Sequence, residues 1–153
     1  MTAHRAVPDS DTLRRPAFRF APTALELLLA CGGSDTFTPT EETVAGIYEA
    51  TTFTVTSRVG TTDLLLAGAT VDATLAPDGT TSGRLFVPGG AEDGSDLDED
   101  LTGTWTLTGE TVTFDQTADT FIRDAEFIAG RNTLTGEGTF SGVSGFLQLV
   151  KAD

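Results

Sequence analysis

Histidine, cysteine and lysine are almost absent from this chain. Its 153 residues include one histidine (His4), one cysteine (Cys31) and one lysine (Lys151). A single cysteine cannot form an internal disulfide, so the folded part must rely on its core. Because His4 lies in a segment that we expect to be removed, the ordinary Ser-His-Asp and Cys-His arrangements and imidazole metal sites are excluded. Paired carboxylates, as in glycosidases, stay open, but the composition favours a protein that is not an enzyme.

Positive charge is scarce as well. Nine Lys+Arg residues oppose 23 Asp+Glu residues, which gives a formal net charge of −14 at pH 7. Such an acidic surface repels phosphate backbones, so nucleic acid is excluded as a partner. Hydrophobic residues make up 39% of the chain, which is too many for a disordered tail, and the length suits one domain.

Glycine is missing from the first thirty residues, although the whole chain has 17. The same stretch carries four of the nine basic residues, so it is slightly basic while the rest is strongly acidic. This asymmetry predicts a targeting peptide over residues 1–30 in front of a single domain. Within it, residues 20–30 form a short, mostly apolar run. A run of this length cannot cross a bilayer, which needs about 20 residues, but it is typical of a signal-peptide core.

The apolar run ends in Leu28-Leu29-Ala30-Cys31. These residues resemble the lipobox of bacterial lipoproteins, which is cleaved before its cysteine. The resemblance implies that Cys31 carries diacylglycerol on its thiol and, usually, a further acyl chain on its amine. Two or three chains make a stable anchor. It therefore implies an exported protein whose first partner is the membrane, on the periplasmic face of the outer or inner membrane or on the cell surface.

Two other interpretations of the N-terminal segment stay open. Residues 20–30 would also suit a small amphipathic helix, with Cys31 as an ordinary buried thiol. Arg14-Arg15 resembles a twin-arginine signal, which would imply a different export route. In each case the polar residues 31–43 are expected to form a tether in front of a domain at 44–153.

Beyond residue 43 the chain is rich in Thr, Val, Phe and Gly, with apolar residues at alternate positions. This pattern predicts strands, because β-branched residues suit a half-exposed pleated surface. A hairpin turning at Gly109-Glu110 is the clearest unit. Leu134, Gly136, Gly138 and Phe140 share one face, and the glycines there indicate a tight bend. The expected strands are near 46–59, 63–75, 81–87, 101–108, 111–116, 119–129, 132–140 and 143–151.

Short strands joined mostly by tight turns predict an all-β fold, an antiparallel up-and-down meander of about eight strands that closes into a barrel. Gly46-Ile47-Tyr48, Pro77-Asp78-Gly79 and the stretch 103–109 resemble the lipocalin-like domain of small bacterial lipoproteins. The resemblance covers residues 44–153. It implies a lipocalin-like barrel that binds a small hydrophobic molecule.

Four aromatic residues are candidates to line such a ligand site: Tyr48, Trp105, Phe114 and Phe127. These side chains could instead fill the core, because the interior of a small barrel is only wide enough for side chains. The choice between a usable cavity and a packed core stays open at this point.

The densest negative charge lies in residues 92–100. Asp96, Asp98 and Asp100 have the spacing of oxygen ligands in a calcium loop, but Leu101 stands where the EF-hand pattern needs glycine. Acidic runs are usually solvated, so we expect a loop between the third and fourth strands and no cofactor.

The sequence thus predicts a lipid-anchored envelope protein with a non-catalytic barrel that binds a small hydrophobic ligand. The alternative is an accessory subunit, a rigid acidic barrel that docks on an envelope protein complex. The two differ in whether the barrel contains a cavity.

Overall fold

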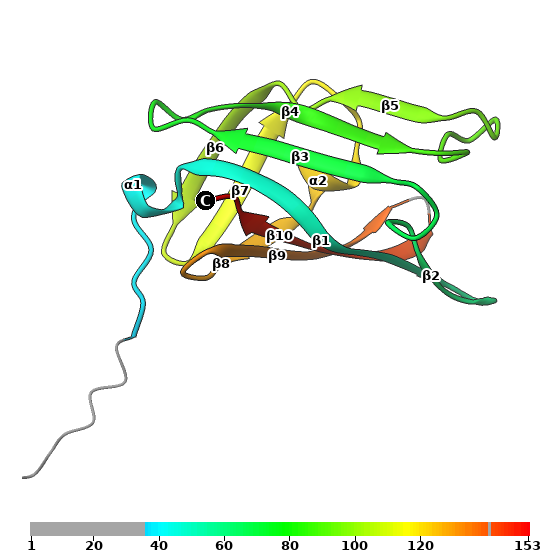
Figure 1. Ribbon diagram of the computed structural model, residues 1–153, viewed down its shortest axis with the longest axis horizontal. Coiled ribbons are helices and arrows are strands. Elements are labelled where there is room, and N and C mark those ends of the chain that lie inside the picture. The colour runs from blue at the N-terminus through cyan, green and yellow to red at the C-terminus, as the bar shows by residue number, and fades with distance from the viewer. Residues whose placement is uncertain (1–35, 141) are drawn as a thin grey trace, which may run out of the picture. The chain divides into compact units, whose positions relative to one another are not determined.

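Strands dominate the part of the chain that the computed structural model describes, residues 36–140 and 142–153 (Figure 1). The helices are single turns, α1 (Glu41–Val44) and α2 (Phe121–Asp124). The strands of these described residues are β1 (Gly46–Ser57), β2 (Gly60–Asp63), β3 (Thr70–Leu75), β4 (Thr80–Val87), β5 (Leu97–Asp100), β6 (Gly103–Thr108), β7 (Thr111–Gln116), β8 (Glu126–Ala129), β9 (Thr133–Phe140) and β10 (Val143–Lys151).

Eight of these strands form a closed barrel. Strands β1, β3, β4, β6, β7, β8, β9 and β10 each pair antiparallel with the next, and β10 pairs back on β1. β2 is an extra strand on β1, and β5 pairs with β4. The expected all-β fold, an eight-stranded antiparallel meander, is confirmed. Closure leaves the barrel strands without free edges.

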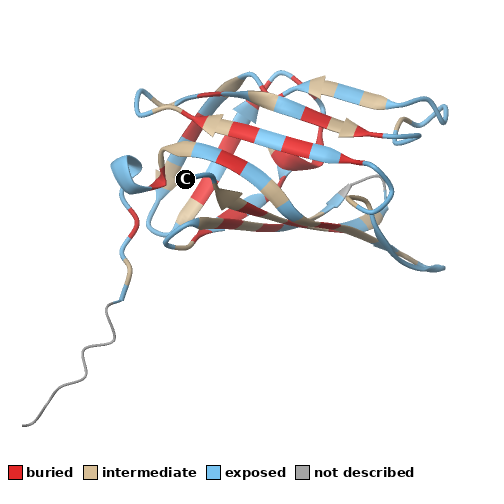
Figure 2. Ribbon diagram, in the orientation of Figure 1, coloured by how far each residue is buried: buried red, intermediate tan, exposed pale blue. Residues whose placement is uncertain are grey.

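The barrel has two ends, which differ in what covers them. The α1 end carries α1 and the turns at 76–79, 109–110 and 130–132. The β2 end carries the β1–β2 hairpin, the loops 64–69 and 88–96, and α2. Along the strands, buried and exposed residues alternate (Figure 2), as the pleat requires for a sheet with one face inside.

The strand expected at 63–75 is confirmed only for residues 70–75, because a turn interrupts it before them. β2 ends at Asp63 and β3 begins at Thr70. Asp63 Oδ1 accepts a hydrogen bond from the Leu66 amide at 3.1 Å, and the Ala69 amide donates to the Leu64 carbonyl at 2.8 Å. The run of apolar residues at 64–67 reads as a buried strand, yet Leu66 is 88% exposed.

The loop expected over 92–100 is also partly wrong, because residues 97–100 form β5. Arg84 of β4 lies opposite Asp100 of β5, and Thr81 of β4 lies opposite Gly103 of β6. The two pairings have the same register. The Leu101 amide donates to the Gly83 carbonyl at 3.0 Å and joins the two ladders. β5 and β6 are therefore one long partner of β4, and the acidic residues sit on a strand.

The strand expected at 119–129 is confirmed only for its last four residues, which form β8. Residues 121–124 form α2 instead and carry the Phe121 ring into the barrel. Gly138 and Gly145, paired across β9 and β10, face that ring. A Cβ atom at Gly145 would lie 2.8 Å from the ring, so the glycines serve to make room for an aromatic side chain.

Part of the expected tether is ordered against the α1 end. Thr40 caps α1, and its hydroxyl accepts a hydrogen bond from the Thr43 amide at 3.2 Å. Val44 is buried in the core, and the Arg131 guanidinium lies 5.7 Å above the Phe37 ring. The chain thus enters the barrel at the α1 end.

Candidate functional site: a cavity at the β2 end

The α1 end of the barrel is filled and hydrogen-bonded. The Tyr48 hydroxyl donates to the Val44 carbonyl at 2.6 Å, and Trp105 Nε1 donates to the Ala76 carbonyl at 2.9 Å. Both side chains are buried, and burial raises the pKa of Tyr48 to about 12. Lys151 Nζ donates to the Thr43 carbonyl at 3.0 Å above them. Buried aromatic side chains with satisfied polar tips indicate core packing here.

The middle of the barrel is filled in the same way. Phe114 and Phe127 meet edge to face, with ring centroids 5.4 Å apart. Gly136 lies directly against the Phe127 ring and leaves room for it. Of the four aromatic residues proposed to line a ligand site, the structure brings these two together, and none of the four borders the cavity described next.

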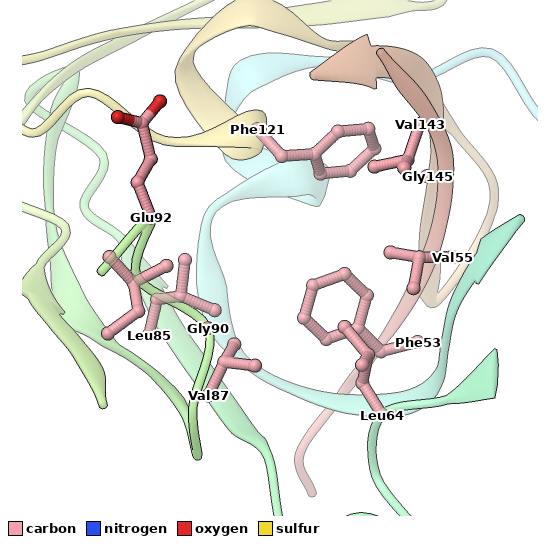
Figure 3. Close-up of a pocket in the computed structure, with 11 residues that line it drawn as sticks. Phe53, Val55, Leu64, Leu85, Val87, Gly90, Glu92, Phe121, Val143 and Gly145 are labelled. Atoms are coloured by element: carbon pink, nitrogen blue, oxygen red, sulfur yellow. The ribbon is translucent and has the colours of Figure 1, made fainter. Parts of the chain in front are cut away.

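A cavity of about 300 Å³ lies at the β2 end. Its lining is almost wholly apolar: Phe53, Val55, Leu64, Leu85, Val87, Gly90, Glu92, Leu97, Phe121, Val143 and Gly145. Figure 3 shows Leu85 and Val87 of β4 on one side of the space and Val55 of β1 on the other. Glu92 is the one charged residue of this lining.

Phe121 forms one wall of the cavity. Its ring stacks on that of Phe53, with centroids 6.4 Å apart and an interplanar angle of 30°. It rests on the paired Gly138 and Gly145, whose missing side chains let α2 approach β9 and β10. The turn of α2 thus reduces the opening of the barrel without filling it.

Small lining residues and the early end of one strand, β7, explain why space remains at this end of the barrel. Gly90 and Gly145 contribute no side chain to the lining. β7 ends at Gln116, so no described strand pairs with the outer edge of β5. A barrel of eight strands is normally just wide enough for its own side chains. The cavity therefore depends on short side chains and on the end of β7 at Gln116.

Acidic residues are concentrated in the segment that contributes Glu92 to the lining. Glu92 is exposed at its margin, on the same side as Leu85 (Figure 3). Asp93 and Asp96 follow it in the loop, and Glu99 lies opposite Leu85 on β5. The cavity therefore has an apolar interior, and negative charge lies along this one segment of its margin.

Two of the three aspartates that have the spacing of a calcium loop accept hydrogen bonds from other groups. Asp96 Oδ1 accepts from the Gly89 amide at 2.9 Å. Asp98 accepts from Arg84 Nε at 2.6 Å and from Nη2 at 2.5 Å, and these hydrogen bonds lower the pKa of Asp98. Asp100 lies two residues further along β5. Among the residues that the structure describes, no group of three or more His, Cys, Asp or Glu is placed to hold a metal ion.

Two sequence predictions fall outside the described residues. Cys31, the predicted lipidation site, and His4 both lie in residues 1–35. Within residues 36–140 and 142–153, no helix has the length and hydropathy needed to span a membrane.

Comparisons with protein-family models, with curated proteins and with solved structures found no match to this chain. The site must therefore be interpreted from its own geometry.

Proposed function

We propose that this protein is a lipid-anchored, non-catalytic barrel of the cell envelope that binds a small hydrophobic molecule in the cavity at its β2 end. The observation that carries the proposal is the contrast between the two ends. The α1 end is packed and hydrogen-bonded, whereas the β2 end holds an apolar cavity of about 300 Å³. That volume is at the lower limit of the range of about 300–1,000 Å³ that is usual for ligand sites.

Placement in the envelope rests on the sequence, through the resemblance of Leu28-Leu29-Ala30-Cys31 to a lipobox. Because the chain enters the barrel at the α1 end, an anchor at Cys31 would be tied to that end. Four residues lie between Cys31 and Thr36, and five steps of about 3.4 Å limit the distance between the two to roughly 17 Å.

A binding assay with a neutral apolar fluorophore, N-phenyl-1-naphthylamine, tests the proposal. Its fluorescence rises when it enters an apolar site. We expect saturable binding to the wild-type protein and at least about tenfold weaker binding to Val55→Trp, a change of about 1.4 kcal/mol. The indole would occupy the cavity from a position in its lining on β1.

Ile47→Trp is the matched control. Ile47 lies on the same strand but on the outer face of the barrel, where it is 56% exposed. We expect this variant to bind the fluorophore as the wild-type protein does. Absence of saturable binding to the wild-type protein, or equal loss in both variants, would contradict the proposal.

The docking role is a second candidate, and two side chains favour it. Val59, at the tip of the β1–β2 hairpin, is 99% exposed, and Leu66, in the following turn, is 88% exposed. Contiguous exposed apolar patches mark protein contact sites, so this candidate requires both side chains to contact the same partner. Under this candidate, a double variant Val59→Ser/Leu66→Ser would lose an envelope protein that co-purifies with the wild type, while fluorophore binding would be absent in both.

A further inference from the structure

We infer that the cavity selects apolar molecules that carry a positively charged amine. This inference rests on the proposed function, since it names the chemistry of the ligand for the same cavity. It depends on the position of Glu92, on the absence of a counterion for that carboxylate, and on the charge around it.

Glu92 is the one charged side chain among the eleven residues that line the cavity. A ligand that places its apolar body against Phe53, Val87 and the other apolar lining residues would meet its one charged neighbour at Glu92. Glu92 lies at the margin of the space, beyond Leu85 and Gly90, with its carboxylate directed outward (Figure 3). An ammonium group there would donate a charge-assisted hydrogen bond to the carboxylate. A ligand with a carboxylate head would be repelled.

The basic residues near this end do not neutralise Glu92. Arg84 is bound to Asp98 through both Nε and Nη2, and Arg123 is bound to Asp119 and Asp124. No ion pair found in the described part of the chain includes Glu92. Arg58, in the turn after β1, is not part of the lining.

The neighbouring charges add to the effect of Glu92. Asp93 and Asp96 lie in the same loop, and Glu99 lies on β5 next to Leu85. A mouth lined by charges of one sign raises the local concentration of ligands of the opposite sign. The whole chain, with its net charge of −14, has the same sign.

The test uses three ligands that share an eight-carbon chain: octylamine, octanol and octanoate. Each is titrated against the wild-type protein with bound fluorophore at low ionic strength, and the concentration that displaces half of the fluorophore is measured. An exposed ion pair is worth up to about 1 kcal/mol, so we expect octylamine to displace the fluorophore at about two- to fivefold lower concentration than octanol. Octanoate should be the weakest, and the preference should shrink in 1 M salt, because salt screens exposed charges.

In Glu92→Gln, octylamine and octanol should displace the fluorophore at equal concentrations, while the affinity for the neutral fluorophore itself should be unchanged. Glu110→Gln, in a turn at the α1 end, is the matched control and should keep the preference for octylamine. If octanol or octanoate displaces the fluorophore from the wild type as well as octylamine does, or if Glu92→Gln keeps the preference, the inference is overturned and the proposed function stands. If the fluorophore itself does not bind, the proposed function fails.

Discussion

Replacing Gly136 by alanine should destabilise the barrel by a net amount of about 0.5–2 kcal/mol. The added Cβ atom would lie 2.6 Å from Cε1 of Phe127 and 2.7 Å from its Cδ1. Phe127 is fully buried, and its ring is held edge to face against Phe114, so it cannot move aside. Overpacking of this kind usually costs about 1–3 kcal/mol. It outweighs the gain of about 0.5–1 kcal/mol that alanine otherwise brings over glycine in a strand.

Gly145→Ala provides the comparison, because it creates a similar contact beside the cavity. There the Cβ atom would lie 2.8 Å from Cε2 of Phe121, but that ring borders open space into which it can tilt. We expect a loss of stability below about 1 kcal/mol together with weaker fluorophore binding, because the tilted ring reduces the cavity.

Urea unfolding followed by circular dichroism measures both substitutions. Adding Phe127→Leu should relieve the contact, so the double variant Phe127→Leu/Gly136→Ala should show a coupling energy of at least about 1 kcal/mol. A change below about 0.5 kcal/mol in Gly136→Ala, or the same cost in the Phe127→Leu background, would refute the reasoning.

Three further predictions concern Tyr48, calcium and Cys31. The free energy of unfolding should fall by about 1–2 kcal/mol in Tyr48→Phe, because the buried Val44 carbonyl loses its hydrogen bond. As the folded-state pKa is about 12 against 10.0 for the free side chain, this contribution is complete below pH 10 and lost as the pH rises towards 12. Tyr48 is the sole tyrosine of the chain, so the absorbance of tyrosinate reports the titration of this residue alone. A titration midpoint near pH 10 would show that Tyr48 is not buried as described. About 5 mM calcium should leave the melting temperature unchanged; an increase would mean that the acidic segment binds the ion after all. Cys31→Ala should move the protein from the membrane fraction to the soluble fraction and leave its signal peptide uncleaved, whereas continued sedimentation with membranes would exclude the lipid anchor.

Alternating patterns predicted the strands best where one face is buried and the other exposed. On β6 and β7, Trp105 lies opposite Phe114, and Gly109 has φ +63° in the connecting turn, as expected from the sequence. β5 was missed because its alternating acidic residues resemble a solvated loop; pairing with the long strand β4 decides its conformation. Tertiary pairing of this kind overrides local propensity.

The location of the cavity could not be predicted from residue patterns. Large aromatic residues suggested a lining, but side chains of that size fill a small barrel, as Trp105 and Phe127 do. Two other aromatic residues, Phe53 and Phe121, line the cavity together with small residues such as Gly90 and Gly145. The glycines at 136 and 138 were interpreted as a tight bend, whereas the structure places the rings of Phe127 and Phe121 against them.

Native mass spectrometry of the full chain, gently extracted from its own membranes, tests the central claim most directly. We predict a mature chain that begins at Cys31, carries acyl mass, and holds a non-covalent small molecule that is lost in Val55→Trp and kept in Ile47→Trp. A chain that carries no small molecule, or one whose small molecule remains in Val55→Trp, would contradict the claim that the cavity at the β2 end is a binding site.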